Sequence, residues 1–260
     1  MKLAIFQVDA FSNLIFKGNP AAVCPLDEWL SDGMLQNIAA ENNLSETAFF
    51  VKEKEGFHIR WFTPITEVSL CGHATLATAA VIFRKLGYKG EILTFKSKSG
   101  NLRVIKEADN YILDFPADRA KRIEKNPEIL QALNIEPEEW WAGIEDYLLI
   151  YQNEGEISSL TPEFEKIRKL TERGIIVSAP GSQTDFVSRF FAPAVGINED
   201  PVTGSAHRTL TPYWAERLKK TALSALQLSK RGGSLKCFDK GERVEISGKA
   251  AFYMQGIIEI

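Results

Sequence analysis

The two halves of the chain carry the same series of motifs, and this internal repeat constrains the fold more than any other feature of the sequence. The matched pairs are RWFTP (60–64) and RFFAP (189–193), CGHA (71–74) and TGSA (203–206), and SKSG (97–100) and SKRGG (229–233). Gly100 lies 28 positions after Gly72, and Gly233 lies 29 positions after Gly204. Three matches in one order, at nearly one spacing, indicate two copies of a single structural unit.

Each copy reads as strands, a helix and then a hairpin. FHIRWFT (57–63) and DFVSRFFA (185–192) are rich in aromatic and β-branched residues, which favour strands. LTFKSKSGNLRVI and ALQLSKRGGSLKCF are both interrupted by glycine, which is typical of a hairpin turn. The run after Gly72 is apolar on nearly all sides, so this helix must be enclosed. We therefore predict an α/β (α+β) fold of two pseudo-symmetric domains, each a curled sheet or barrel around a central helix.

The chain of 260 residues is long enough for two domains of about 100–150 residues each. We expect residues 1–116 to form an N-terminal domain and residues 117–260 a C-terminal domain. The last ~10 residues of the chain are expected to pack back on the N-terminal domain. The segment 116–142 is charged and contains prolines, which predicts a surface helix and a linker. TPEFEKIRKLTERG (161–174) predicts a second charged helix that covers the second sheet.

Composition and charge exclude several classes of function. A formal net charge of −3 argues against broad nucleic-acid binding, which needs a basic surface. Charged residues break the apolar runs too early for a membrane span, and Asp9 comes too soon for a secretory signal. The three cysteines and three histidines show neither disulfide-framework nor metal-ligand spacing. We expect a soluble cytoplasmic protein that binds no metal, nucleic acid or membrane.

Two glycine-led helix starts, Gly72-His73-Ala74 and Gly204-Ser205-Ala206, are the candidate ligand-binding elements. A helix N-terminus offers unpaired N–H groups and the positive end of the helix dipole, which suit a carboxylate or a developing oxyanion. Glycine also lets a ligand approach the backbone closely. If the two copies are related by a pseudo-twofold axis, the two starts face one cleft and hold a small carboxylate-bearing substrate.

Side chains near these starts could supply acid–base chemistry. Glu46 precedes the strand-like TAFFV and is either a solvated strand end or a functional carboxylate. Asp200 either orients His73, hydrogen-bonds a substrate or occupies a turn before Pro201. His73 could equally be a structural histidine, and His207 is a weaker candidate for ligand contact.

A cysteine-pair racemase is a rival reading that the repeat argues against. Such an enzyme needs one thiol in each half, whereas the position equivalent to Cys71 holds Thr203. We therefore interpret Cys71 as a small buried residue and expect its replacement to be tolerated.

At these residues the chain resembles the PhzF-like family of phenazine-biosynthesis-type isomerases and epimerases. The segments that carry the resemblance reach from near residue 6 to the C-terminus and are FQVDAF, GNPAAV, NLSETAFF, RWFTPITEV, LCGHATLA, DFVSRFFAPAVGINEDPVTGSAH, PYWAERL and SKRGG. The resemblance implies the diaminopimelate-epimerase-type fold with the site between its two domains. It also implies a homodimer.

The resemblance implies an isomerase or epimerase that moves a proton at carbon in a small carboxylate-bearing metabolite without a cofactor. It assigns the general acid/base role to Glu46 and supporting catalytic roles to His73, Asp200 and Ser205. It assigns substrate binding to Gly72, Ala74, Gly204 and Asn19. Ser69 and Arg208 depart from the family pattern and leave the substrate open. The alternative is a catalytically inactive metabolite-binding protein on the same fold.

Overall fold

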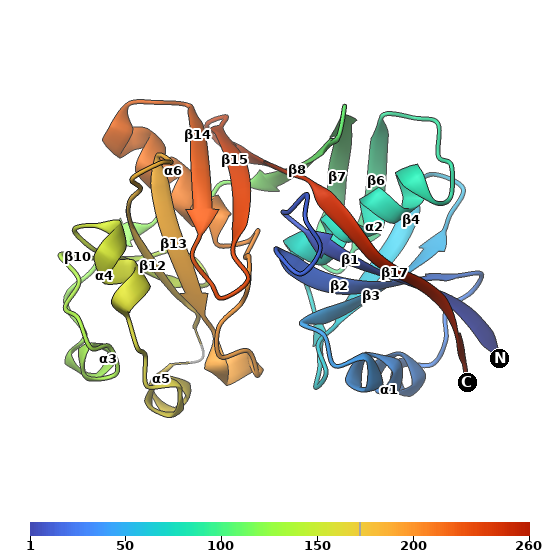
Figure 1. The fold of residues 1–260 in the computed structure, drawn as a ribbon, viewed down its shortest axis with the longest axis horizontal. Coiled ribbons are helices and arrows are strands. Elements are labelled where there is room, and N and C mark those ends of the chain that lie inside the picture. Colours follow the sequence, from blue (N-terminus) through green and yellow to red (C-terminus); the bar gives the residue numbers. More distant parts are fainter. Residues whose placement is uncertain (172) are drawn as a thin grey trace. The chain divides into compact units, whose positions relative to one another are not determined.

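The computed structural model describes residues 1–171 and 173–260, which form two compact units (Figure 1). Unit 1 comprises Met1–Asp114 and Ser247–Ile260, and unit 2 comprises Phe115–Ile246. The last strand, β17 (Ala250–Glu259), pairs with the first, β1 (Lys2–Ala10), along its whole length. Both ends of the chain therefore belong to unit 1.

The remaining elements are distributed between the two units as follows. Unit 1 holds β2 (Asn19–Leu26), α1 (Asp32–Asn42), β3 (Glu46–Lys52), β4 (Phe57–Phe62), β5 (Glu67–Val68), α2 (Gly72–Arg84), β6 (Ile92–Ser97), β7 (Gly100–Glu107) and most of β8 (Asn110–Pro116). Unit 2 holds β9 (Lys121–Arg122), α3 (Pro127–Gln131), β10 (Glu139–Ala142), β11 (Tyr147–Ile150), α4 (Glu154–Ser159), α5 (Phe164–Leu170), β12 (Ile175–Pro180), β13 (Phe186–Phe191), the 3₁₀ helix η1 (Pro193–Val195), α6 (His207–Leu218), β14 (Ala222–Gln227), β15 (Gly233–Asp239) and most of β16 (Arg243–Gly248).

The internal repeat predicted from the motifs is a repeat of strand pairing. In unit 1 the pairs β1–β2, β2–β3, β3–β4, β4–β6 and β6–β7 are antiparallel, parallel, antiparallel, parallel and antiparallel in turn. In unit 2 the pairs β10–β11, β11–β12, β12–β13, β13–β14 and β14–β15 follow the same order. Helices α2 and α6 occupy equivalent crossovers, before the hairpins β6–β7 and β14–β15. This mixed α/β organisation and both glycine-containing hairpins confirm the predicted fold class.

Helix α2 is enclosed, as its apolar sequence predicts. Every residue from Gly72 to Phe83 is buried, and the helix packs against β1, β2 and β3. Thr75 and Thr78 are its buried polar side chains besides His73, and their hydroxyls donate to Cys71 O and Ala74 O within the same helix. The two threonine hydroxyls are thus satisfied by the helix backbone, and Arg84 is the first exposed residue of the helix.

Helix α6 contains a proline that the rest of unit 2 accommodates. Pro212 has no N–H to donate to the carbonyl of Arg208, four residues earlier. That carbonyl instead accepts from Asp118 N at 3.1 Å. The carboxylate of Asp118 accepts from Thr209 Oγ1 at 3.0 Å, so the same residue holds the helix at two points.

The segment 116–142 differs from its prediction. It contains the five-residue helix α3 and the strands β9 and β10, with β10 forming part of the sheet of unit 2. Trp140 anchors β10 because its side chain is 2% exposed in the core of this unit. The apolar pair Trp140 and Trp141 therefore outweighs the surrounding charges in deciding the local structure.

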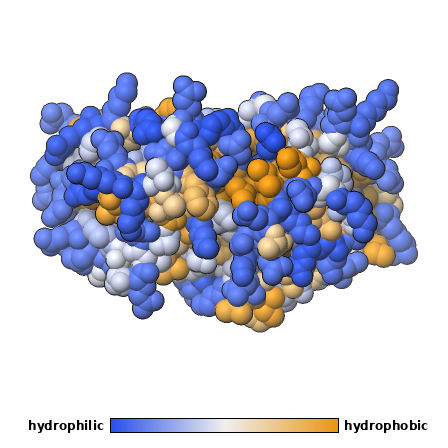
Figure 2. Space-filling model, turned by 90° about the horizontal axis from the view of Figure 1, so that it is seen from above, coloured by the Kyte–Doolittle hydropathy of each residue, from blue (hydrophilic) through white to orange (hydrophobic). Residues whose placement is uncertain are grey.

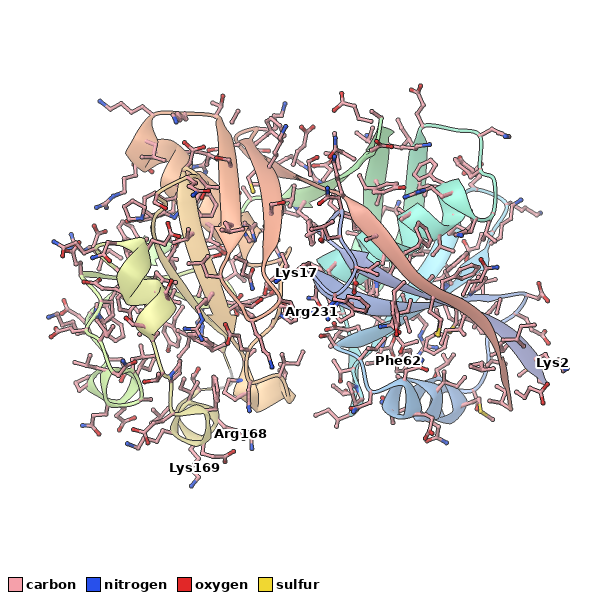
Figure 3. The ribbon with its side chains drawn as sticks, viewed as in Figure 1. Lys2, Lys17, Phe62, Arg168, Lys169 and Arg231 are labelled. Atoms are coloured by element: carbon pink, nitrogen blue, oxygen red, sulfur yellow. The ribbon has the colours of Figure 1, made fainter. Side chains whose placement is uncertain are left out.

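The charged helix predicted within 161–174 is α5, which ends at Leu170; Glu172 lies outside the described residues. Ile167 packs into the core of unit 2 with Ile175 and Val177. Arg168 and Lys169 project from the other side of the helix (Figure 3). Phe164 and Leu170, at the two ends of the helix, pack against the same core and help to fix it on the sheet.

Figure 2 shows a molecular face covered mainly by hydrophilic side chains, with a few apolar patches between them. No helix in the described part of the chain has the length and apolarity that a bilayer crossing requires.

Gly18 fixes the chain immediately before β2 and Asn19. Its φ is +67°, and a Cβ atom at this position would lie 2.2 Å from Ala10 O. Gly18→Ala is expected to lower the free energy of unfolding by more than about 2 kcal/mol, because the left-handed backbone and the clash both oppose a side chain.

Gly33→Ala is the matched control: nothing lies within 4 Å of its Cβ position in α1. This control should keep or raise stability, by up to about 1 kcal/mol. If urea unfolding showed the same loss of stability in Gly18→Ala and Gly33→Ala, the structural requirement for glycine at position 18 would be contradicted.

Candidate functional site

Unit 1 brings Glu46 and His73 into direct contact. Glu46 is the first residue of β3, and His73 is the second residue of α2. Oε2 of Glu46 lies 3.1 Å from Nε2 of His73. The two residues are 7% and 4% exposed, which excludes the reading of Glu46 as a solvated strand end.

The other ring nitrogen of His73 has two neighbours. Nδ2 of Asn19 lies 3.0 Å from Nδ1, and Sγ of Cys71 lies 3.5 Å from the same atom. Asn19 is the first residue of β2 and is fully buried. Four side chains from three different elements thus form one buried cluster in unit 1: Asn19, Glu46, Cys71 and His73.

Electrostatics favour a proton on His73 and on Cys71. Burial lowers the pKa of His73, the neighbouring Cys71 and Glu46 raise it, and the result lies well above the ordinary histidine value. Burial raises the pKa of the Cys71 thiol, so this group keeps its proton at neutral pH. The contact between Oε2 of Glu46 and Nε2 of His73 is thus one of the causes that raise the pKa of the ring.

The start of α2 is an environment that favours a carboxylate. Cys71 is the N-cap residue, and its side chain makes no capping hydrogen bond. The first turn, with Gly72, His73 and Ala74, contains no acidic residue of its own. A helix of 13 residues places positive dipole charge at this end, which favours a carboxylate beside it.

Glu46, Cys71 and His73 also offer one potential metal ligand atom each within 4.8 Å of one another. Carboxylate, thiolate and imidazole are donors that suit zinc. His73, however, lies with Nε2 beside Glu46 and Nδ1 beside Cys71, and the lone pairs of the two ring nitrogens point in different directions. A single ion could not use both ring nitrogens, so the contacts on the two sides of the ring do not belong to one metal site.

Unit 2 holds the remaining predicted residues around a different buried network. Asp200 is 6% exposed, and its Oδ2 accepts from Thr203 Oγ1. Gln227 is fully buried at the end of β14; its Oε1 accepts from Thr203 N at 2.8 Å and its Nε2 donates to Asp200 O at 2.8 Å. One amide side chain therefore holds the loop 200–203 in place.

The turn Gly204-Ser205-Ala206 precedes helix α6 rather than beginning it. The helix starts at His207. The turn before it is closed by hydrogen bonds between residues three positions apart, such as the one from His207 N to Gly204 O. Gly204 is buried and Ser205 is half-buried. The predicted equivalence with the start of α2 is thus correct in position but differs in local geometry.

His207, the weaker candidate for ligand contact, is fully buried. Its Nδ1–H donates to Thr203 O at 2.7 Å, because a carbonyl oxygen can only accept. The ring of Phe186 packs 5.9 Å away. Burial lowers the pKa of His207 from 6.5 to about 4, so the ring is neutral at neutral pH.

This burial predicts a stability loss in acid. Between pH 6.5 and about 4 the unfolded chain binds a proton at His207 that the folded chain does not. Stability should therefore fall with decreasing pH by about 1.4 kcal/mol per unit from this residue alone, roughly 3 kcal/mol over the window. Urea unfolding at several pH values should show a steeper slope for the native chain than for His207→Gln. Equal slopes would contradict the prediction.

Sequence reasoning missed three residues of these networks. Cys71 was interpreted as a packing residue, yet its sulfur contacts His73; its position two residues before a histidine at a helix start is the available signal. Thr203 was considered only as the counterpart of Cys71. Gln227 could have been recognised as a lone amide in the apolar strand ALSALQ.

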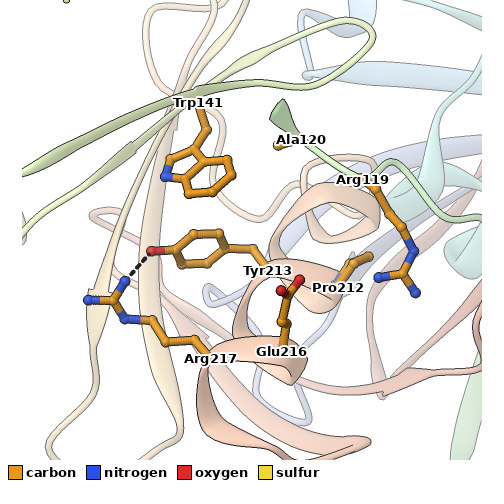
Figure 4. Close-up of a pocket in the computed structure, with 7 residues that line it drawn as sticks. All are labelled: Arg119, Ala120, Trp141, Pro212, Tyr213, Glu216 and Arg217. Atoms are coloured by element: carbon orange, nitrogen blue, oxygen red, sulfur yellow. Dashed lines mark hydrogen bonds between the residues drawn. The ribbon is translucent and has the colours of Figure 1, made fainter. Parts of the chain in front are cut away.

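A cavity of about 330 Å³ in unit 2 contains none of the predicted residues (Figure 4). Its lining residues are Arg119, Ala120, Trp141, Pro212, Tyr213, Glu216 and Arg217. Nη1 of Arg217 donates to the Tyr213 hydroxyl at 2.8 Å and to Glu139, so this guanidinium is already committed within the protein.

Comparisons with known proteins agree over the whole chain. The model of the phenazine biosynthesis-like proteins (PhzC-PhzF) matches residues 8–256. A Pseudomonas aeruginosa protein named as an uncharacterized isomerase is 53% identical over 260 residues, which are 100% of both chains. The crystal structure of a PhzF family protein from Enterococcus faecalis matches with a TM-score of 0.96 and 48% identity over 100% of both chains. A predicted epimerase from Pseudomonas aeruginosa has a TM-score of 0.81 at 17% identity over 99% of both chains, which shows the shared fold alone.

Proposed function

Because the chain belongs to the phenazine biosynthesis-like family of isomerase-type enzymes, we propose that it moves a proton at carbon in a small carboxylate-bearing metabolite without a cofactor. Glu46 is the general acid/base in this proposal. The observation that carries it is the buried contact between Glu46 and His73 at the positive end of α2.

The chemistry of this pair suits proton transfer at carbon. The Glu46 carboxylate takes a proton from a carbon made acidic by a neighbouring carboxyl group, and the C–H electron pair moves into that group. Neutral Glu46 then returns the proton to another carbon that is conjugated with that group, which gives an isomerisation; an epimerisation needs a second acid to protonate the opposite face of the same carbon. The sum is an isomerisation or an epimerisation with no net change in protons. Positioned acid–base groups of this kind contribute about 10²–10⁴ in rate.

The other predicted residues have supporting roles in the proposal. His73 stabilises the Glu46 carboxylate, and Asp200 and Ser205 hydrogen-bond the substrate. Backbone N–H groups at Gly72, Ala74 and Gly204 bind the carboxylate of the substrate. The helix start and the turn thus provide this binding without a charged side chain. Asn19 is fully buried, and its side-chain amide lies 3.0 Å from Nδ1 of His73.

Exchange with deuterium oxide tests the proposed function. Small carboxylic acids are first screened for binding by calorimetry, and each binder is then incubated with the protein in deuterium oxide. Mass spectrometry should show deuterium at carbon in at least one binder. Binding without any label uptake would favour the inactive metabolite-binding alternative.

Cys71→Ala distinguishes this mechanism from a cysteine-dependent one. The thiol keeps its proton at neutral pH, since burial raises its pKa. We therefore expect exchange rates within about threefold of the native rate, because the Glu46 carboxylate is unaffected. Loss of exchange on this substitution, with Cys24→Ala as a second buried cysteine for control, would make Cys71 part of the chemistry.

A cytoplasmic location and a homodimer are further parts of the proposed function. Within the described residues Cys24, Cys71 and Cys237 are buried and form no disulfide, which fits a reducing compartment. The homodimer rests on the family likeness, and sedimentation equilibrium would decide it.

A further inference from the structure

The contacts of Asn19 constrain where His73 carries its proton. A neutral imidazole has one N–H, and its other nitrogen can only accept. Nδ2 of Asn19 is a donor and lies 3.0 Å from Nδ1 of His73. When the ring is neutral, Nδ1 is therefore the accepting nitrogen and the proton resides on Nε2, which lies 3.1 Å from Glu46.

We infer that Asn19 is a positioning residue that holds His73 in the Nε2–H tautomer, so that His73 keeps its N–H toward Glu46, 3.1 Å away, and does not shuttle protons. The inference rests on the proposed function for its catalytic consequence, but not for the tautomer itself. To pass on its Nε2 proton and stay neutral, the ring would have to take up another proton on Nδ1, against the N–H of Asn19. That state is disfavoured, so Glu46 is left as the group that moves the proton.

The surrounding structure fixes Asn19 in this position. Its backbone opposes Ala10 in the β1–β2 ladder, and Gly18 immediately before it adopts a left-handed conformation that a side chain would obstruct. Its side chain is fully buried, so water does not compete for the contact. Cys71 is the second neighbour of Nδ1, and its protonated thiol can also only reinforce the accepting role of that nitrogen.

Two influences act on Nδ1 in opposite directions. The negative charge of Glu46 favours a second proton on the ring, which would have to sit on Nδ1. The N–H of Asn19 opposes a proton there. The decisive measurement is therefore the tautomer of the neutral ring, followed across a pH titration.

Nitrogen NMR of the full chain labelled with ¹⁵N-histidine makes this measurement without any ligand. The chain has three histidines, and His58→Gln and His207→Gln samples assign the His73 signals. At the basic end of the titration, Nδ1 of His73 should show the shift of an unprotonated nitrogen and Nε2 that of a protonated one. The opposite assignment would overturn the inference.

Asn19→Asp provides the perturbation, since a carboxylate accepts a hydrogen bond from Nδ1–H. The variant should move the proton of the neutral ring to Nδ1 and keep the ring charged to a pH at least one unit higher. Asn13→Asp is the matched control, because it adds the same charge at an exposed position of the preceding loop. An Asn19→Asp titration identical to that of the control would also overturn the inference. If Asn19→Asp does not fold, the native spectrum alone decides.

The kinetic readout separates this inference from the proposed function. Where exchange is observed, Asn19→Asp should lower its rate at least tenfold and shift the pH of half-maximal rate by at least one unit, with the KM within threefold. An unchanged pH profile would contradict a positioning role. Absence of exchange in the native chain would refute the proposed function and leave the tautomer to the NMR result.

Discussion

Glu46→Gln is expected to reduce isomerase turnover at least about a hundredfold while the affinity for a bound carboxylic acid changes less than about threefold. Glutamine has nearly the shape of glutamate and its carbonyl oxygen can still accept from His73, so the buried cluster should remain intact. It cannot take up a proton from carbon. The loss should therefore appear in kcat and in deuterium uptake, and not in binding.

Glu41→Gln is the control for this substitution. Glu41 lies exposed in α1, five positions before Glu46, and undergoes the same change in charge. The turnover of the Glu41→Gln variant should equal that of the native protein. A Glu46→Gln variant that turns over like the Glu41→Gln control would remove Glu46 from the mechanism.

Gln227→Leu is expected to lower the free energy of unfolding by roughly 2–5 kcal/mol. The side chain accepts from Thr203 N and donates to Asp200 O, both inside a buried network. Leucine fills a similar volume but leaves this N–H and this carbonyl without their partner, and each unsatisfied buried group costs about 1–3 kcal/mol.

Urea unfolding followed by circular dichroism measures this loss. Gln255→Leu is the control because Gln255 is exposed on β17, and its replacement should change stability by less than about 0.5 kcal/mol. Asp200 and Thr203 should also lose their ordered arrangement in Gln227→Leu. A stability within experimental error of the control would show that the network does not hold the loop.

Much of the fold could be predicted from the sequence because the same series of motifs occurs in both halves of the chain. The motif RWFTP marks the end of β4 and RFFAP the end of β13, and the same pairing order surrounds both. Where the repeat is absent, local composition is the only guide, and it predicts the short helix α3 but not the strands β9 and β10. The segment 116–142 has the charge of a surface helix, but Trp140 and its neighbour pair as a strand with β11.

The candidate site could be predicted in part, since residues close in sequence to a helix start are easily recognised. Glu46 and His73 were both named, yet their contact depends on β3 and α2 meeting in the fold, which spacing cannot reveal. Asn19 was assigned to substrate binding, and only the structure places its amide against His73. Tertiary packing likewise decides that Gln227 and His207 are buried rather than available to a ligand.

The most direct test of the central claim is deuterium uptake at carbon by protein dialysed against a metal chelator, in the presence of a carboxylic acid that binds. The Glu46–His73 pair needs no added metal or coenzyme, so the dialysed protein should label the acid at the undialysed rate. Loss of labelling that returns only when a metal ion or coenzyme is restored would contradict the account.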